Sequence, residues 1–481
     1  MQIVSYRGPG MAGGVSPALT RLVADGSAHH TWWHIDSDTI KYSTAAGKVV
    51  TKQPIPKAVI EGHYRYCNDF IWPIMHDLHE YATYRSEDRA LYERFNRIMA
   101  REIASNRATG RTLMPNKMFV QDYQLALLPK ELQRLDGPRC GVFWHIPWPK
   151  SVPQEFLPAL TDMAKSILSA EFIGFHTQEY CANFFRFVSK HIDGVSVSIR
   201  DRVVIREPKS HAFNPQHSLF TVPSPTPERT TPDDLSTRVI SAPLGLDVDH
   251  WQSLASIKTN TVLHPALLKT DFVLSVDRAD YTKGVIPRLE AIHHFFNDHP
   301  EMIGKITFAQ LCTQTRPGLE AFDAYWNDLQ RMSREINNKY RNQDWQPIHN
   351  LKGPLNPKDL SVLYGHASVM LVNPLRDGLN LTAKEYVACQ SDNPGALMLS
   401  PHAGAYEELG QWAVDADPFD PREMGHSVFE ALQLTDSDKK DRMQNMLAVL
   451  KANTISSWCD QFKFLLEPSV ESEMEAVEAT S

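Results

Sequence analysis

The sequence predicts an α/β protein built from two doubly wound domains. Short apolar runs of strand length alternate with helix-like segments, which is the pattern of parallel sheets covered by helices. Several of these runs end in polar and charged residues, as strands do where an α/β sheet meets a ligand crevice. At 481 residues, the chain is long enough for two domains that each bury a core.

Three candidate strands in the first half end in polar or aromatic groups. Residues 118–120 precede Gln121-Asp122-Tyr123, residues 140–144 precede the turn that begins with His145, and residues 172–175 precede His176. Because the carboxyl ends of parallel strands meet at one edge of a sheet, we expect these groups along one side of a cleft. His176 is interpreted as a structural histidine.

The middle and the end of the chain suggest domain limits. Residues 206–234 contain six prolines, which exclude a helix or a central strand and favour an exposed loop or hairpin insertion. We predict a first domain over 1–245, with its hinge near 243–247, and a second over 246–455. A helix over 456–466 would cross back to the first domain, and the acidic tail 467–481 is predicted to be disordered.

The second half contains candidate strands at 272–274, 306–308, 369–372 and 395–400. After 369–372 comes a dense polar cluster that includes Asp377, Asn380 and Glu385. Residues 380–385 can start a helix, whose free N–H groups and positive dipole end suit a phosphate. The alternative is an ordinary strand-to-helix turn with normal capping.

A second cluster places two cations near a strand end. Arg278 and Lys283 lie five residues apart after the run 272–274. A guanidinium fork and a compact ammonium together suit a diphosphate. Taken alone, two basic residues near a turn usually form a solvated face, but two such clusters in one half of the chain favour a sugar-nucleotide pocket.

Composition limits the partners. Net charge is −8, five Glu fall in the last fifteen residues, and no basic stripe stands out, so we expect no nucleic-acid partner. The six cysteines are scattered without CxxC spacing, which argues against a zinc site or a disulfide framework and for a reducing compartment. Without a stretch of membrane-spanning length we expect a cytoplasmic protein with no membrane partner. A homo-oligomer is compatible with the sequence.

These motifs together resemble the trehalose-6-phosphate synthase family of retaining glycosyltransferases, over about residues 2–464. The related glucosylglycerol-phosphate synthases are similar over the same segments. The resemblance implies the GT-B fold, in which two Rossmann-like domains face each other across a cleft. The C-terminal domain would hold the nucleotide sugar, and the N-terminal domain would supply most of the acceptor site.

The resemblance also implies a donor site. It places Arg278 and Lys283 on the diphosphate and Glu385 on the ribose hydroxyls. Glucose and phosphates would be held by Asp377 and the backbone of Gly378, Leu379, Asn380 and Leu381. Gly13-Gly14 is similar to the family's loop over the diphosphate, where the missing Cβ lets amides approach closely.

On the acceptor side, Arg7 and Arg316 match two phosphate-binding arginines, one from each domain, and Trp32 and Trp72 match acceptor-site tryptophans. Without the resemblance, each tryptophan is equally well read as a core residue. The resemblance implies that Arg316 favours a hexose phosphate over glycerol 3-phosphate as acceptor, because the glucosylglycerol-phosphate synthases lack an arginine at this position.

The chain departs from the family pattern at two places. The family's His-Asp-Tyr-His motif appears as Gln121-Asp122-Tyr123-Gln124. A family acceptor-site tyrosine would fall on His63, with Tyr64 next to it, so either the register slips by one residue or the acceptor pocket differs. Both departures affect the identity of the acceptor more than the donor site.

The expected reaction moves glucose from a nucleotide diphosphate glucose to glucose 6-phosphate and forms trehalose 6-phosphate, with glycerol 3-phosphate or a cyclitol phosphate as alternative acceptors. A sensor of sugar phosphates without catalysis is the third reading. The donor nucleobase stays open.

The expected catalytic groups are cations, a carboxylate and a histidine. Arg278 and Lys283 would stabilise the leaving phosphate, so no cofactor or divalent cation is expected; the one Asp-x-Asp match, at 247–249, falls in the hinge. The resemblance implies front-face attack rather than double displacement. Asp122 would bond sugar hydroxyls between donor and acceptor, and His145 the 6-hydroxyl of the donor glucose.

Overall fold

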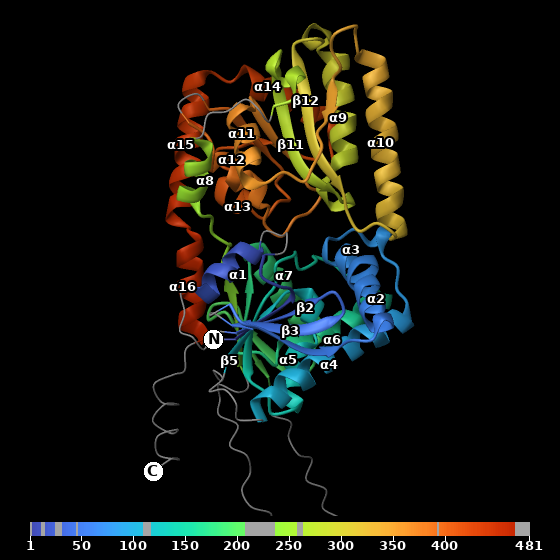
Figure 1. Ribbon diagram of the computed structural model, residues 1–481, viewed down its shortest axis with the longest axis vertical. Coiled ribbons are helices and arrows are strands. Elements are labelled where there is room, and N and C mark those ends of the chain that lie inside the picture. Colours follow the sequence, from blue (N-terminus) through green and yellow to red (C-terminus); the bar gives the residue numbers. More distant parts are fainter. Residues whose placement is uncertain are drawn as a thin grey trace, which may run out of the picture.

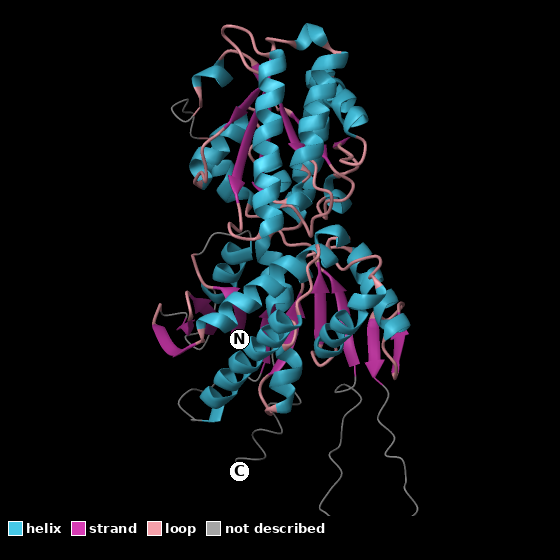
Figure 2. Ribbon diagram, turned by 90° about the vertical axis from the view of Figure 1, so that its right-hand side faces the viewer, coloured by secondary structure: helices cyan, strands magenta, loops and turns pink. Residues whose placement is uncertain are grey.

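The computed structural model describes residues 2–10, 15–24, 31–44, 47–108, 117–206, 236–256, 263–391 and 394–466. Two α/β bodies lie one above the other, each with a sheet at its centre (Figure 1). Helices flank the strands of both sheets (Figure 2). The predicted α/β class with two parallel-sheet domains is therefore confirmed.

The first sheet has ten strands in the order β4-β3-β2-β1-β5-β6-β7-β10-β9-β8. From β2 to β10 all neighbours are parallel, whereas β3 and β4 on one edge and β8 and β9 on the other pair in antiparallel fashion. The strands are β1 (Gln2–Arg7), β2 (Thr31–Asp36), β3 (Thr39–Thr44), β4 (Val49–Pro54), β5 (Lys117–Gln121), β6 (Arg139–Phe143), β7 (Phe172–Phe175), β8 (Val195–Ser198), β9 (Val203–Arg206) and β10 (Ser236–Ser241). Its helices are α1 (Val15–Ala24), α2 (Lys57–Arg65), α3 (Trp72–Met75), α4 (Ser86–Ala108), α5 (Leu128–Arg134), α6 (Leu157–Ile167) and α7 (Gln178–His191), with a π-helical turn, Tyr66–Ile71, between α2 and α3.

The second sheet has six parallel strands in the order β13-β12-β11-β14-β15-β16. They are β11 (Asp271–Ala279), β12 (Ile306–Gln314), β13 (Ile348–Asn350), β14 (Val369–Val372), β15 (Ala396–Leu399) and β16 (Val414–Asp415). The helices of this half are α8 (Val248–Ala255), α9 (Val285–Asp298), α10 (Glu320–Tyr340), α11 (Pro357–His366), α12 (Leu381–Ala388), α13 (Tyr406–Leu409), α14 (Pro421–Gln433), α15 (Asp436–Ala452) and α16 (Ile455–Leu466). Strand β11 runs five residues beyond the predicted run 272–274, because it pairs along its whole length with the equally long β12.

The chain passes between the two bodies twice. Residues 242–247 lead out of the first sheet, and residues 453–455 lead back, with Leu246 paired to Thr454. Gly245 permits this close passage, since a Cβ there would lie 2.1 Å from the Thr454 carbonyl carbon. Helix α16 then covers one face of the first sheet, with Trp458 and Phe462 in the same apolar cluster as residues of β1, β5 and β7 (Figure 1).

Some sequence predictions fall outside the described residues. These are the Gly13-Gly14 loop, nearly all of the proline-rich segment 206–234, and the acidic tail 467–481. The numerical domain limits stay a prediction. No helix in the described part of the chain has the length and apolar character needed to cross a membrane.

Candidate active site

A cavity of about 600 Å³ lies between the carboxyl ends of the two sheets. It is lined by residues in or just after the last part of strands β1, β5, β6 and β7 on one side and of β11, β12 and β14 on the other. Fourteen of the predicted site residues line it: Arg7, His63, Tyr64, Trp72, Asp122, His145, Arg278, Lys283, Arg316, Asp377, Leu379, Asn380, Leu381 and Glu385. Residues from both halves of the sequence therefore meet at one site, as the strand-end motifs predict.

Trp32 corrects the prediction for the acceptor site. It lies near the start of β2, on the opposite end of the strand from the cavity, and is 1% exposed. Its ring packs in the cluster beneath α1 and α16, and its indole N–H donates to the Ser5 hydroxyl at 2.7 Å. Trp32 is therefore a core residue, and the alternative reading of that tryptophan holds.

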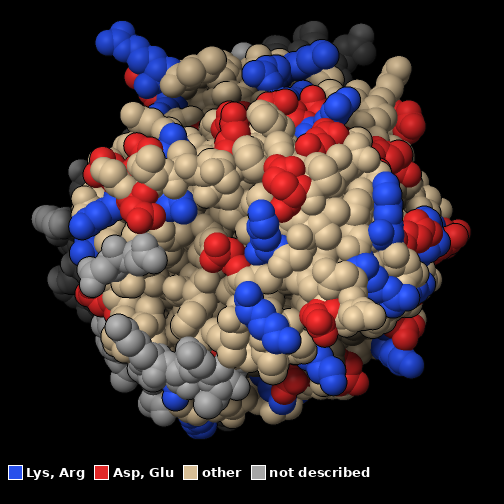
Figure 3. Space-filling model, turned by 90° about the horizontal axis from the view of Figure 1, so that it is seen from above, with Lys and Arg blue, Asp and Glu red and all other residues tan. Residues whose placement is uncertain are grey.

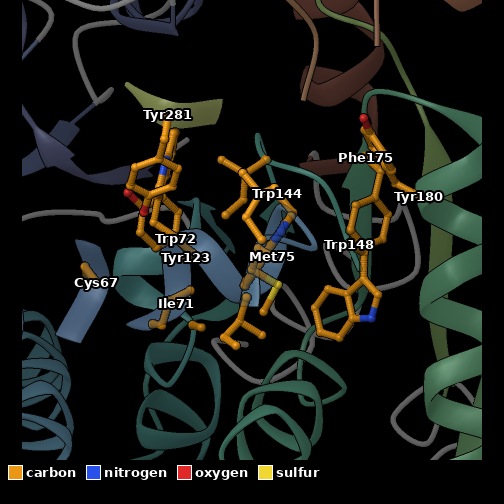
Figure 4. Close-up of a cluster of buried hydrophobic side chains, with 14 of the residues drawn as sticks. Cys67, Ile71, Trp72, Met75, Tyr123, Trp144, Trp148, Phe175, Tyr180 and Tyr281 are labelled. Carbon is orange, nitrogen blue, oxygen red and sulfur yellow. The ribbon is translucent and has the colours of Figure 1, made fainter. Parts of the chain in front are cut away.

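Trp72 instead stands where the two domains meet. Its indole N–H donates to the Asp280 carboxylate at 3.3 Å, and the Arg316 guanidinium lies over its ring at 4.2 Å. Figure 4 shows it in one aromatic cluster with Tyr123 and Tyr281. A stacked guanidinium has its orientation fixed by the ring, which leaves its edge for polar partners.

Asp280 is the anion that holds the basic cluster together. Its carboxylate pairs with Arg316 at 2.6 Å. Burial alone would raise its pKa, but Arg316, Arg278 and Lys283 together hold the pKa of this carboxyl far below its usual range. Burial and the neighbouring Arg316 lower the pKa of the Arg278 guanidinium. Sequence reasoning missed Asp280, although its position between Arg278 and Lys283 was a usable signal.

Lys283 makes a second ion pair, with Asp377 at 2.5 Å. Burial would raise the pKa of Asp377, but Lys283 lowers it overall. Asn380 donates to the same carboxylate at 3.0 Å and caps α12, accepting from the Ala383 N–H at 3.2 Å. The predicted helix start is thus correct, and α12 begins at the cavity wall.

Gly378 packs between the domains rather than lining the cavity. A Cβ on Gly378 would lie 2.0 Å from the His145 carbonyl oxygen, so only a glycine permits this approach. Beside it, the Tyr180 hydroxyl donates to the Asp377 carbonyl at 2.7 Å, and Arg376 pairs with Glu179 at 3.0 Å. These contacts tie the loop after β14 to the first domain.

Glu385 lies within the cavity wall on α12. Its carboxylate accepts from the Tyr364 hydroxyl at 3.0 Å. Burial raises the pKa of Glu385 to about 7, against the lowering effect of that hydrogen bond. The carboxyl group therefore changes charge near neutral pH.

Asp122 has a strained backbone. Its φ of 70° and ψ of 174° fall in a region that is essentially reserved for glycine, at a cost of roughly 1–3 kcal/mol. Seven described non-glycine residues have positive φ, and three of them, Asp122, Arg316 and Asn380, line this cavity. The Asp122 carboxyl accepts from the His145 backbone N–H at 3.0 Å, and burial raises its pKa to about 7. Such strain is typical of functional sites.

His145 already bonds protein groups through both ring nitrogens. Its Nδ1 lies 3.2 Å from Nε2 of His176, and its Nε2 lies 2.9 Å from the Gln121 side-chain oxygen. Burial lowers the pKa of His145 to about 3, so its ring is neutral. The sequence identified His145 but treated His176, which also lines the cavity, as structural.

The departure at His63 favours a one-residue slip. The His63 ring is fully buried, its Nε2 donates to the Gln124 carbonyl at 3.0 Å, and burial lowers its pKa to about 4. The Tyr64 phenol is close enough to Arg7 and Arg316 for their charges to oppose the rise in its pKa that burial causes. Tyr64 is therefore the residue of this pair that offers a polar group to a ligand.

Neither the surface charge in Figure 3 nor the arrangement of metal-binding side chains in the described residues points to a further ligand. Acidic and basic side chains are interspersed over the face of the second domain seen from above (Figure 3). Within the described ranges, no group of three or more His, Cys, Asp or Glu side chains is placed to hold a metal ion.

Comparison with known proteins gives a family. The model described as glycosyltransferase family 20 matches residues 28–467. The chain is 28% identical over 414 residues to a trehalose-phosphate synthase named as UDP-forming from Pichia angusta, covering 83% of this chain and 79% of that protein. It is 27% identical over 470 residues to a glucosylglycerol-phosphate synthase from Pseudomonas anguilliseptica, covering 96% of this chain and 60% of that protein.

Among solved structures, a UDP-forming trehalose-phosphate synthase from Burkholderia xenovorans in complex with glucose-6-phosphate superposes with a TM-score of 0.80 at 25% identity, covering 97% of this chain and 99% of that one. The protein from E. coli bound with UDP-2-fluoro glucose superposes with a TM-score of 0.83 at 24% identity, covering 98% of this chain and 99% of that one. These matches confirm the predicted GT-B fold.

Several relatives are longer than this chain. It covers 53% of a bifunctional trehalose-6-phosphate synthase/phosphatase from Thermoproteus tenax, at 29% identity over 424 residues and 86% of its own length. It spans about half of two further relatives, at 47% and 51% of their lengths. Because the family model and the fold agree over nearly the whole described chain, the protein belongs to glycosyltransferase family 20.

Proposed function

We propose that the protein transfers glucose, with retention, from a nucleotide diphosphate glucose to glucose 6-phosphate and forms trehalose 6-phosphate. One observation carries the proposal: basic side chains from both domains, Arg7 on one side and Arg278, Lys283 and Arg316 on the other, line a single cavity. Two reactants that each bear phosphoryl groups need such a site, because cations from both sides offset the repulsion between them.

The donor half of the site suits a sugar nucleotide. Arg278, Lys283 and the first turn of α12, which line the cavity, would stabilise the negative charge that grows on the leaving diphosphate. Asp377, held by Lys283 and Asn380, would accept from glucose hydroxyls. Glu385, oriented by Tyr364, would accept from the ribose hydroxyls. The relatives from Pichia and Burkholderia are named UDP-forming, so uridine is the first nucleobase to test.

The acceptor half suits a sugar phosphate. Arg316 stacks on Trp72 and faces the same cavity as Arg7 and Tyr64. Two guanidinium groups and a phenol can bind a phosphate dianion through charge-assisted hydrogen bonds. Because one arginine comes from each domain, an acceptor phosphate would bridge them.

The chemistry follows front-face attack, in which the departing phosphate takes the acceptor's proton. Asp122 would bond sugar hydroxyls at the donor–acceptor junction rather than attack carbon, because its carboxyl is held by the His145 N–H and its pKa of about 7 leaves it partly protonated at neutral pH. His145 would donate from Nε2 to the donor glucose, sharing a hydrogen that Gln121 accepts in this structure. We expect no divalent cation in this scheme, and the partners are small molecules in the cytoplasm.

A second candidate keeps the donor and changes the acceptor to glycerol 3-phosphate. It is favoured by the glucosylglycerol-phosphate synthase relative and by Gln121 and Gln124, which replace both histidines of the family motif. A cyclitol phosphate is the remaining acceptor to test. A sensor without catalysis is disfavoured because Arg278, Lys283 and Glu385 still line the cavity.

An activity matrix tests the proposal. Purified protein is incubated with UDP-, ADP- or GDP-glucose and with glucose 6-phosphate, glycerol 3-phosphate or inositol phosphate, and nucleotide release and product mass are measured. We expect release above the acceptor-free control with glucose 6-phosphate. Release only with another acceptor would refute the leading assignment, and binding without release in every combination would support the sensor.

A further inference from the structure

A chain of buried hydrogen bonds runs from α12 in the second domain to the candidate active site in the first. Leu244, in the segment that leads out of the first sheet, uses both of its backbone groups in it. Its carbonyl accepts from the Lys384 ammonium at 2.9 Å, and its N–H donates to Nδ1 of His176 at 3.3 Å. Nε2 of His176 is then hydrogen-bonded to Nδ1 of His145. Nε2 of His145 is in turn hydrogen-bonded to the side-chain oxygen of Gln121.

The Leu244 N–H, which can only donate, gives the bonds of this chain one direction, although the Ala242 carbonyl also lies near the His176 ring and opposes the fall in its pKa. Because a backbone N–H donates, Nδ1 of His176 is an acceptor, and in a neutral ring the proton must then be on Nε2. His176 therefore donates to Nδ1 of His145, which places the His145 proton on Nε2 as well. That proton is donated to Gln121, whose amide oxygen must face His145.

Both rings are held neutral by their surroundings. His176 is 3% exposed and His145 is 8% exposed. Burial lowers the pKa of His176 well below its usual range, and the neighbouring His145 and the Lys384 ammonium lower it further. A protonated His176 would lose its bond from the Leu244 N–H, because neither nitrogen could then accept.

Lys384 is fixed just as firmly at the other end. It is fully buried and forms an ion pair with Glu408 at 2.5 Å. Asn453, in the segment that returns to the first domain, donates to Glu408 at 2.8 Å and to the Pro243 carbonyl at 3.2 Å. Both segments that connect the domains, 242–247 and 453–455, are therefore linked to Lys384, which immediately precedes Glu385.

We infer that His176 is a positioning residue for glucosyl transfer, which holds His145 in the Nε2–H tautomer with that N–H toward the site, and that Lys384 anchors this arrangement by fixing Leu244. This inference rests on the proposed function for the role of His145 toward the donor glucose. In it, His145 is a neutral hydrogen-bond donor and never a base, since its other nitrogen is occupied by His176. The orientation of the His145 ring therefore depends on the position of residues 242–247, the segment that contains Leu244.

The tautomers can be measured directly on the whole protein. With ¹⁵N-labelled histidine, the imidazole nitrogens of His145 and His176 are identified by their loss in His145→Gln and His176→Gln. We expect both rings to be neutral at neutral pH with the proton on Nε2. An Nδ1–H tautomer or a protonated ring at either position would overturn the inference. This measurement needs no substrate, so its failure is distinct from failure of the proposed function.

Kinetics then separate positioning from simple packing. His176→Phe keeps a ring but cannot donate to His145, whereas the amide of His176→Gln can place a donor near the position of Nε2. We expect kcat to fall about tenfold or more in His176→Phe, with KM for the nucleotide sugar changed less than about threefold, and to recover in large part in His176→Gln. The positioning role of His176 would be overturned if His176→Phe had the same kcat as the unmodified protein. It would also be overturned if kcat fell equally in His176→Phe and His176→Gln. If His176→Phe does not fold, the tautomer measurement on the unmodified protein still decides.

Discussion

Replacing Asp122 by Asn should stabilise the protein above neutral pH while it damages turnover. The carboxyl is buried, and its pKa is raised from 3.8 to about 7. Asn keeps a carbonyl oxygen for the His145 N–H and has a similar shape, so the backbone strain at this position is about the same in both proteins. The substitution therefore removes mainly the charge that burial disfavours.

The magnitude follows from the rise in the pKa of Asp122 from 3.8 to about 7 on folding, since a tenfold change in proton affinity corresponds to about 1.4 kcal/mol. A group whose pKa is raised on folding contributes stability that is complete below its unfolded pKa and is lost as pH rises through its folded pKa. Relative to the unmodified protein, Asp122→Asn should thus gain about 4 kcal/mol in free energy of unfolding near pH 8 and less than about 1 kcal/mol near pH 4.

The assay is urea unfolding of both proteins at those two pH values, with kcat measured in parallel. We expect kcat to fall about a hundredfold if Asp122 bonds the reacting sugars. A stability difference that does not change with pH would refute the reasoning about the buried charge. An unchanged kcat would refute the role at the donor–acceptor junction.

Four further predictions use the same geometry. Gly378→Ala should lower kcat/KM about tenfold or more and lower Tm, because its Cβ would lie 2.0 Å from a backbone oxygen, whereas Gly365→Ala, whose Cβ would have no neighbour nearer than 3.9 Å, should keep activity. Tyr364→Phe should raise KM for the nucleotide sugar about tenfold at neutral pH and move its pH dependence upward, since lost hydrogen bonding raises the pKa of Glu385; a profile identical to the unmodified protein would contradict this. Arg316→Lys should raise KM for the sugar phosphate about tenfold and change KM for the nucleotide sugar less; equal effects on both would contradict a role specific to the acceptor, and a larger effect on the nucleotide sugar would assign Arg316 to the donor side. A chelator should leave the rate within about twofold, and a rate that a chelator abolishes and magnesium restores would show a metal requirement.

Local signals identified most of the residues that the structure brings together in the cavity. The capping residue Asn380 and the apolar strand before it are adjacent in the sequence, so the start of α12 could be placed without knowing the fold. The strand ends at His145 and Arg278 were recognisable for the same reason. The α/β class followed from the alternation of strand and helix segments, which is a property of the whole chain.

The rest depends on contacts between distant residues. Trp32 and Trp72 have the same side chain, and only the fold shows that one lies in the core and the other at the domain boundary. The chain from Lys384 to His176 joins residues 140 and 68 positions apart in its two steps through Leu244, so no spacing pattern could reveal it.

The double passage of the chain near Gly245 and Thr454 bears on how donor and acceptor preferences could be recombined. Since α16 completes the first body after the second has been built, the second body is an internal cassette rather than a C-terminal appendage. A chimera made at one junction would strip that helix from its partner sheet. Exchange of donor preference between relatives should therefore succeed only when both junctions are cut and the segment between them is transplanted as one piece.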